Sequence, residues 1–193
     1  MQVQTSIQAE KAMQTLTGKW AGRFVWASVV QGAIAVAWTV FLISPWTIPA
    51  APRVIAAGGA GTWLFVGYSL YLMVGVLAVA VTAVFYMYIE RILGKVYRGV
   101  AGYLAWSHLI LMNVGALGAT SLMMVAGYLG GAAALPTNVG GQGLNAGQVH
   151  ANILVVYPEP IFYFAAVAVL GVLLGGLGYI LSARGRQPLL PQP

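Results

Sequence analysis

The sequence contains no cysteine and no aspartate, and only 6% of its 193 residues are charged. The missing cysteine excludes disulfides, thiolate metal sites and a cysteine nucleophile. The missing aspartate excludes a Ser–His–Asp triad, and three scattered glutamates offer no carboxylate pair. The glycine-rich run at 140–143 is not followed by a lysine and a helix, so it is not a phosphate-binding loop. We therefore expect that the chain is not catalytic by itself.

Charge is scarce while apolar residues are abundant, at 60% of the chain. A soluble domain carries roughly a quarter charged residues. A chain this apolar cannot cover its own surface in water, so lipid must be part of its solvent. The net charge is +6. Its basic residues sit at the ends of apolar segments rather than in one patch, which argues against a nucleic-acid partner.

Four apolar stretches are long enough to cross a bilayer, for which a helix needs about 20 residues. They are Phe24–Ile43, Trp63–Tyr88, Val100–Leu129 and Ile161–Leu181. The first is longer than the apolar part of a signal peptide, so we interpret it as an uncleaved anchor. The stretches are continuously apolar and lack the alternation of barrel strands. The sequence thus predicts an all-α protein, a transmembrane bundle of four helices.

Basic residues predict the orientation of this bundle. They precede the first span (Lys11, Lys19, Arg23), fill the turn between the second and third (Arg91, Lys95, Arg98) and follow the fourth (Arg184, Arg186). Arg53 alone lies between the first two spans, and residues 130–160 contain no Lys or Arg. Under the positive-inside rule both termini are cytoplasmic. We expect a multi-pass protein of the cell membrane, with Arg91, Lys95 and Arg98 as cytoplasmic anchors.

Three parts follow from this pattern. Residues 1–19 form a cytoplasmic segment, either an interfacial helix or a frayed tail. Residues 20–183 form the membrane domain, in which residues 130–160 are an irregular loop outside the membrane. Residues 184–193 are rich in proline and are expected to be a disordered cytoplasmic tail.

Small residues mark the surfaces through which the helices are expected to pack, because helix association in lipid relies on close backbone approach. Gly171 and Gly175 form a GxxxG pattern in the fourth span, and Gly115 and Gly118 lie in the third. Several polar residues at membrane depth are each expected to bond to another helix: Gln31, Ser69, Thr82, Asn113 and Thr120.

His108 is the only histidine within a span, roughly 12 Å deep at 1.5 Å per residue. It is the one candidate cofactor ligand, because an intramembrane histidine can bind heme or relay protons. The alternative is a neutral imidazole that hydrogen-bonds between helices. A heme held by two histidines would need a second one at similar depth, and His150 lies in the loop on the other side.

Two glutamates complete the candidates. Glu90 ends the second span beside Arg91 and near Lys95, where it is either an interfacial ion pair or an entry point for protons. Glu159 and His150 offer a metal pair in the outer loop, but a metal site usually needs three or four ligands. No metal site is predicted.

A longer pattern covers residues 62–183. It begins with Tyr68-Ser-Leu-Tyr-Leu-Met-Val-Gly75 and Phe85-Tyr-Met-Tyr88, continues through the basic turn Arg91-Ile-Leu-Gly-Lys-Val-Tyr-Arg98, and reaches His108-Leu-Ile-Leu-Met-Asn-Val-Gly115. This stretch resembles the last three transmembrane helices of subunit I of the heme–copper oxygen reductases. In that family these helices run in the directions that the charges predict here.

The heme and copper ligands of that family do not carry over. Aligned on Gly75, its two heme-ligating histidines fall on Gly67 and Ser69. Its Met-Pro-Arg-Arg stretch matches the region from Gly130 to Pro136, which has no arginine. Its copper-binding histidines lie on helices that this pattern does not include. The resemblance therefore implies a relative of the catalytic subunit without its metal centres.

The leading hypothesis is a non-catalytic, accessory subunit of an aerobic terminal oxidase of the heme–copper type. It implies that this chain alone binds no cofactor, that heme and copper belong to partner subunits, and that its partners are the oxidase catalytic subunit, lipid and quinol. The alternatives are a helical subunit of another membrane enzyme, such as a copper monooxygenase, a small transporter or channel, and a b-type cytochrome.

Overall fold

The computed structural model describes residue 4 and residues 19–184 of the chain. The expected N-terminal segment, apart from Lys19, and the tail beyond Arg184 lie outside the described residues. So do Lys11 and Arg186 of the orientation pattern. Lys19 begins the first helix, and Arg184 ends the last one. The first helix thus begins one residue before the expected bound at 20, and the last helix ends one residue after the expected bound at 183.

Four helical segments in the described part of the chain are long and apolar enough to cross a membrane. The first is α2 (Lys19–Ile43), and the third is α6 (Val100–Ala134). The second is built from η1 (Gly59–Gly61), α4 (Thr62–Leu70), η2 (Tyr71–Leu77), α5 (Ala78–Met87) and η3 (Tyr88–Ile92), and the fourth from η5 (Leu154–Val156) and α8 (Pro158–Arg184). Residues 19–184 contain no strand. The predicted all-α, four-helix fold is confirmed.

The second span contains two π-helical stretches, η2 and η3. In η3 the Leu93 N–H donates to the Tyr88 carbonyl, five residues back, at 3.0 Å. Such wide turns shift the face that a helix presents, and they often lie at functional sites. Here η2 begins with the buried Tyr71, and η3 contains the buried Glu90.

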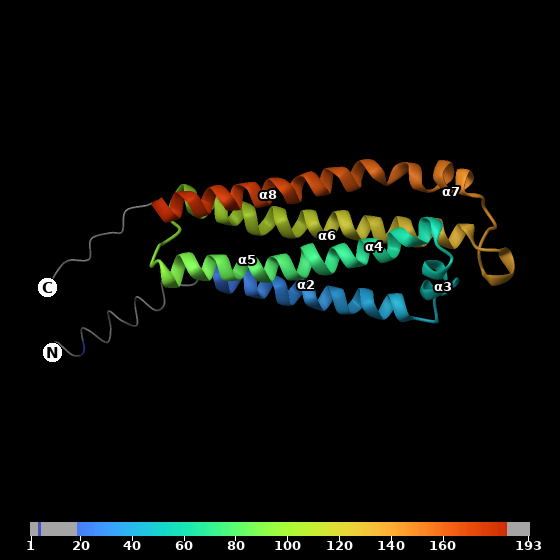
Figure 1. Cartoon of the computed structure of the whole chain (residues 1–193), viewed down its shortest axis with the longest axis horizontal. Coiled ribbons are helices and arrows are strands. Elements are labelled where there is room, and N and C mark those ends of the chain that lie inside the picture. The colour runs from blue at the N-terminus through green and yellow to red at the C-terminus, as the bar shows by residue number, and fades with distance from the viewer. Residues whose placement is uncertain (1–3, 5–18, 185–193) are drawn as a thin grey trace.

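The four spans run side by side along the long axis of the molecule (Figure 1). The most extensive packing joins α6 to α8, followed by α6 to α4 and α2 to α5. The start of α2, the end of α8 and the turn between η3 and α6 lie at one end, which we call the basic end. The opposite end, which we call the far end, carries the short helices α3 (Ala51–Ala56) and α7 (Ala146–Asn152).

The prediction of an irregular loop at 130–160 is partly wrong. α6 continues to Ala134, and the segment then forms η4 (Thr137–Val139), α7 and η5 before α8 begins. A capping box starts α7, because the Asn145 side chain accepts from the Gln148 N–H and the Gln148 side chain accepts from the Asn145 N–H, both at 3.0 Å. The pattern Asn-x-x-Gln predicts this start.

Glycines allow α6 and α8 to approach closely. A Cβ at Gly171 would lie 2.6 Å from the Met112 nitrogen, and one at Gly115 would overlap the backbone of Ala168. A Cβ at Gly118 would overlap the Phe164 ring. The structure therefore places the GxxxG pattern and both α6 glycines at one contact, as helix packing through small residues requires.

Candidate functional site

His108 lies in the bundle interior, where its side chain is only 3% exposed. Its Nδ1 is 3.3 Å from the Tyr86 hydroxyl, so a hydrogen bond joins α6 to α5. Its ring also packs against Phe24 at 5.1 Å and Tyr179 at 6.0 Å between centroids. His108 therefore contacts the three other spans and forms a bridge between helices.

Gly175 makes this position possible. A Cβ at residue 175 would overlap the His108 ring, including Nδ1. The second glycine of the GxxxG pattern thus accommodates a side chain, whereas the first accommodates backbone. The requirement for glycine at 175 follows from the imidazole that fills the space.

A heme held by His108 and a second histidine has no support in this geometry. His150 lies on α7 at the far end, where it is exposed and lines a cavity of about 350 Å³ with Trp63. The structure does not bring Glu159 together with it into a set of three metal-ligating side chains, and no such set exists among residues 19–184. His108 stands alone at its depth, among aromatic rings.

Glu90 is buried and accepts backbone hydrogen bonds from the start of the first span, a contact that neither sequence interpretation included. Its side chain is 3% exposed, and its carboxylate accepts the Trp20 N–H at 3.1 and 3.2 Å and the Ala21 N–H at 3.0 Å. A carboxylate at the first turn of α2 satisfies N–H groups that have no partner within the helix, and it complements the helix dipole. Arg91, by contrast, is exposed. Glu90 is thus a cap from another helix.

Between Glu90 and His108 lies a group of buried hydroxyls that sequence reasoning missed. Tyr86 stacks on Phe24 at 4.6 Å and faces Tyr97 at 4.9 Å between centroids. The hydroxyls of Tyr97, Tyr179 and Ser182 are buried without a hydrogen bond of ordinary geometry, although Ser182 is near enough to Tyr97 to favour its ionised form slightly. Burial dominates and raises the pKa of Tyr97, so its hydroxyl stays protonated.

A second buried polar group lies deeper. The Tyr71 hydroxyl donates to Gln31 Oε1 at 2.5 Å, and Gln31 Nε2 donates to Asn113 Oδ1 at 2.9 Å. Asn113 Nδ2 in turn donates to the Leu109 carbonyl at 2.7 Å. This network joins α2, η2 and α6, so the prediction that Gln31 and Asn113 bond across helices is confirmed. Fully paired networks of this kind hold helices in register.

The same prediction is wrong for two other residues. Ser69 bonds to the Phe65 carbonyl at 2.9 Å, and Thr120 bonds to the Ala116 carbonyl at 2.6 Å, each within its own helix. Thr82 bonds to the Ala78 carbonyl at 2.8 Å and contacts Met112 across the bundle. Hydroxyls reach the carbonyl four residues back, so they need no partner elsewhere.

Basic side chains gather at one end of the bundle. The exposed anchors Arg91 and Arg98 flank the turn that also holds Lys95. The start of α2 and the end of α8 bring further cations to the same end, whereas Arg53 lies in α3 at the far end. The spans therefore place the three basic segments of the sequence together.

Comparisons with known protein families, with curated proteins and with solved structures found no match for this chain.

Proposed function

We propose that the chain is a non-catalytic subunit of an aerobic terminal oxidase of the heme–copper type, inserted in the cell membrane with its basic end in the cytoplasm. The sequence resemblance over residues 62–183 motivates the proposal. The observation that carries it is how the structure fills the positions that match the family's heme ligands.

One of those positions, Gly67, serves helix packing in this chain. A Cβ at Gly67 would lie 2.9 Å from the Met124 side chain and 3.0 Å from the Met124 nitrogen, so α4 and α6 are in direct contact there. Ser69 bonds to its own helix. A family-like order of helices, with one ligand position used for packing and the other bonded within its own helix, supports a relative that has kept the scaffold and lost the metal centres.

The buried polar groups support a structural role as well. His108, Gln31 and Asn113 each bond to another helix, and Glu90 caps α2. These bonds fix the first three spans relative to one another. A rigid bundle with apolar outer faces suits a subunit that packs against other membrane proteins, holds lipid and borders a quinol route.

Purification of the tagged full-length protein from its native membranes in mild detergent tests the proposal. We expect an oxidase catalytic subunit to co-purify, with the absorption bands of heme in the complex. A His108→Gln variant is the matched comparison. It should retain the heme bands, because in this proposal the heme belongs to the partner.

Two results would overturn the proposal. A preparation without any oxidase subunit favours the small transporter or channel, or a subunit of another membrane enzyme. Heme bands that disappear with His108→Gln, while the same subunits still co-purify, identify His108 as a ligand and make the chain a cytochrome.

A further inference from the structure

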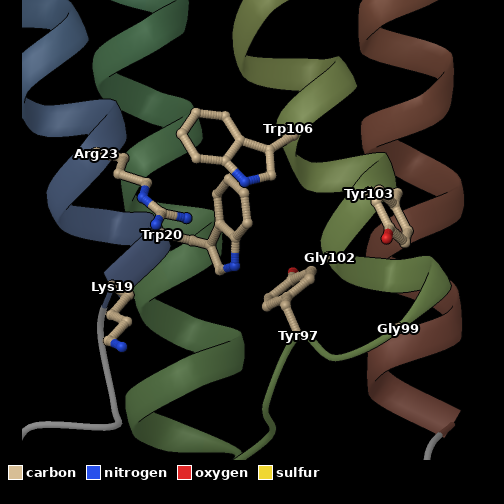
Figure 2. Close-up of a pocket in the computed structure, with 8 residues that line it drawn as sticks. All are labelled: Lys19, Trp20, Arg23, Tyr97, Gly99, Gly102, Tyr103 and Trp106. Carbon is tan, nitrogen blue, oxygen red and sulfur yellow. The ribbon is translucent and has the colours of Figure 1, made fainter.

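A pocket of about 380 Å³ opens at the basic end between the start of α2 and the start of α6. Figure 2 shows its lining, which includes Lys19 and Arg23 from α2 and Trp106 and Tyr103 from α6. Its volume lies within the range of small-ligand sites, roughly 300–1,000 Å³. None of the interactions described for His108 or Gln31 uses this pocket.

Two indole rings position the Arg23 guanidinium. Its central carbon lies 4.3 Å from the Trp20 ring centroid and 4.4 Å from that of Trp106. The two rings meet almost at right angles, 5.2 Å apart, and the guanidinium fills the corner between them (Figure 2). Such cation–π contacts hold the planar group, so its N–H donors are ordered in advance.

Among the described residues that line the pocket, Lys19 and Arg23 carry positive charge and none is acidic. The carboxylate of Glu90, which reaches the start of α2 from η3, already accepts the N–H groups of Trp20 and Ala21. Gly99 and Gly102, at the start of α6, add the positive end of a helix that has no side-chain cap.

The aromatic residues place this charge at the level of lipid headgroups. Tyr103 is 76% exposed and Trp106 is 44% exposed, and both lie within the first two turns of a membrane span. Amphipathic rings of this kind favour the membrane–water interface. At such an interface the ring edges that face outward would meet acyl chains, and the two cations would meet the polar layer.

We propose that this pocket binds a phosphate group, with Arg23 as its fixed donor and Lys19 as a second cation. The chemistry is that of a phosphodiester in an anionic lipid headgroup or of free phosphate. Arginine donates to phosphate through two parallel N–H groups. This inference does not depend on the oxidase proposal.

Native mass spectrometry of the full-length protein in detergent, titrated with phosphatidylglycerol or phosphatidylcholine, tests the site. We expect one phosphatidylglycerol to bind more tightly than phosphatidylcholine. Arg23→Gln should weaken it about tenfold, and the exposed Lys19→Gln about fivefold, since a basic residue near a membrane surface contributes about 1 kcal/mol. Arg184→Gln, at the same end but outside the pocket, should have no effect.

A third arm adds inorganic phosphate in large excess. Retained lipid identifies the headgroup as the ligand, and displaced lipid identifies free phosphate, so either result supports a phosphate site and names its source. Equal binding of the two lipids, or unchanged binding in both Arg23→Gln and Lys19→Gln, overturns the proposal. Arg23→Lys keeps the positive charge but loses the planar pair of N–H donors. We expect it to bind phosphatidylglycerol more weakly than wild type and more tightly than Arg23→Gln, which distinguishes loss of the guanidinium donors from loss of the fold.

Discussion

At the basic end α2 begins on a buried carboxylate, whereas at the far end α4 and α6 meet backbone to backbone. A Cβ at Gly127 would overlap the Leu64 nitrogen, and one at Gly131 would lie 2.7 Å from the Gly61 Cα. The corresponding contact at the basic end is made by Glu90, Trp20 and Arg23 through hydrogen bonds and ring contacts.

The difference between the two contacts follows from what the lipid interior and the membrane surface each allow. Lipid is as apolar as leucine, so two helices within it gain little from apolar burial and rely on close approach. At the membrane surface polar and charged groups can be hydrated or paired, so side chains of many kinds are tolerated. The contact between α4 and α6 is therefore close-packed around glycine, while the basic end contains a pocket lined with cations.

The largest expected effect is on chemical labelling of the two ends. The chain has no cysteine, so single cysteines can be placed by Val96→Cys at the basic end and Asn138→Cys at the far end. In intact cells a membrane-impermeant maleimide should label residue 138 and not residue 96. Opened cells should label both, which controls for access. Labelling of residue 96 alone in intact cells would reverse the proposed orientation.

The next effect is on the close packing of the far end. Gly127→Ala introduces a methyl group where the Leu64 backbone already lies, and we expect it to lower the free energy of unfolding by about 3 kcal/mol. Gly176→Ala on α8 is the matched control, because no atom lies within 4 Å of its Cβ position. It should stabilise slightly through helix propensity. Thermal unfolding in detergent compares the two, and equal melting temperatures would contradict the packing.

Local pattern predicts one part of this structure well. The four spans follow from continuous apolar runs, and α6 starts at the predicted Val100. The ends fall outside the predictions where small residues such as Ala132 and Ala134 extend a helix beyond its most apolar part. The sequence also contains a signal for the start of α7, because Asn145 and Gln148 are three residues apart and cap the same helix.

Contacts between distant segments could not be predicted from the sequence in this way. Glu90 bonds to residues about 70 positions away, and its neighbours Arg91 and Lys95 suggest an ion pair instead. Trp20 and Trp106 lie in different spans, and only the fold brings both to Arg23. A one-dimensional pattern predicts which residues face lipid or water, but it does not predict which interior side chains meet.

The smallest effects compare the helix caps of the two ends. Glu90→Ala leaves the N–H groups of Trp20 and Ala21 buried without an acceptor, and we expect a loss of about 2 kcal/mol. Asn145→Ala removes an exposed cap from α7, whose N–H groups water can reach, so about 0.5–1 kcal/mol is expected.

Hydrogen exchange measured along the chain distinguishes these two caps better than melting alone. Glu90→Ala should accelerate exchange at the start of α2 and leave α7 unchanged, while Asn145→Ala should do the opposite. Glu159→Ala is the control, because its carboxylate is exposed and accepts the Tyr163 hydroxyl. If Glu90→Ala exchanged like Glu159→Ala, the buried carboxylate would not be holding α2, and the basic end would depend on its aromatic contacts alone. A faster start of α2 with unchanged α7 instead shows that a single charge organises the end of the bundle where the phosphate pocket lies.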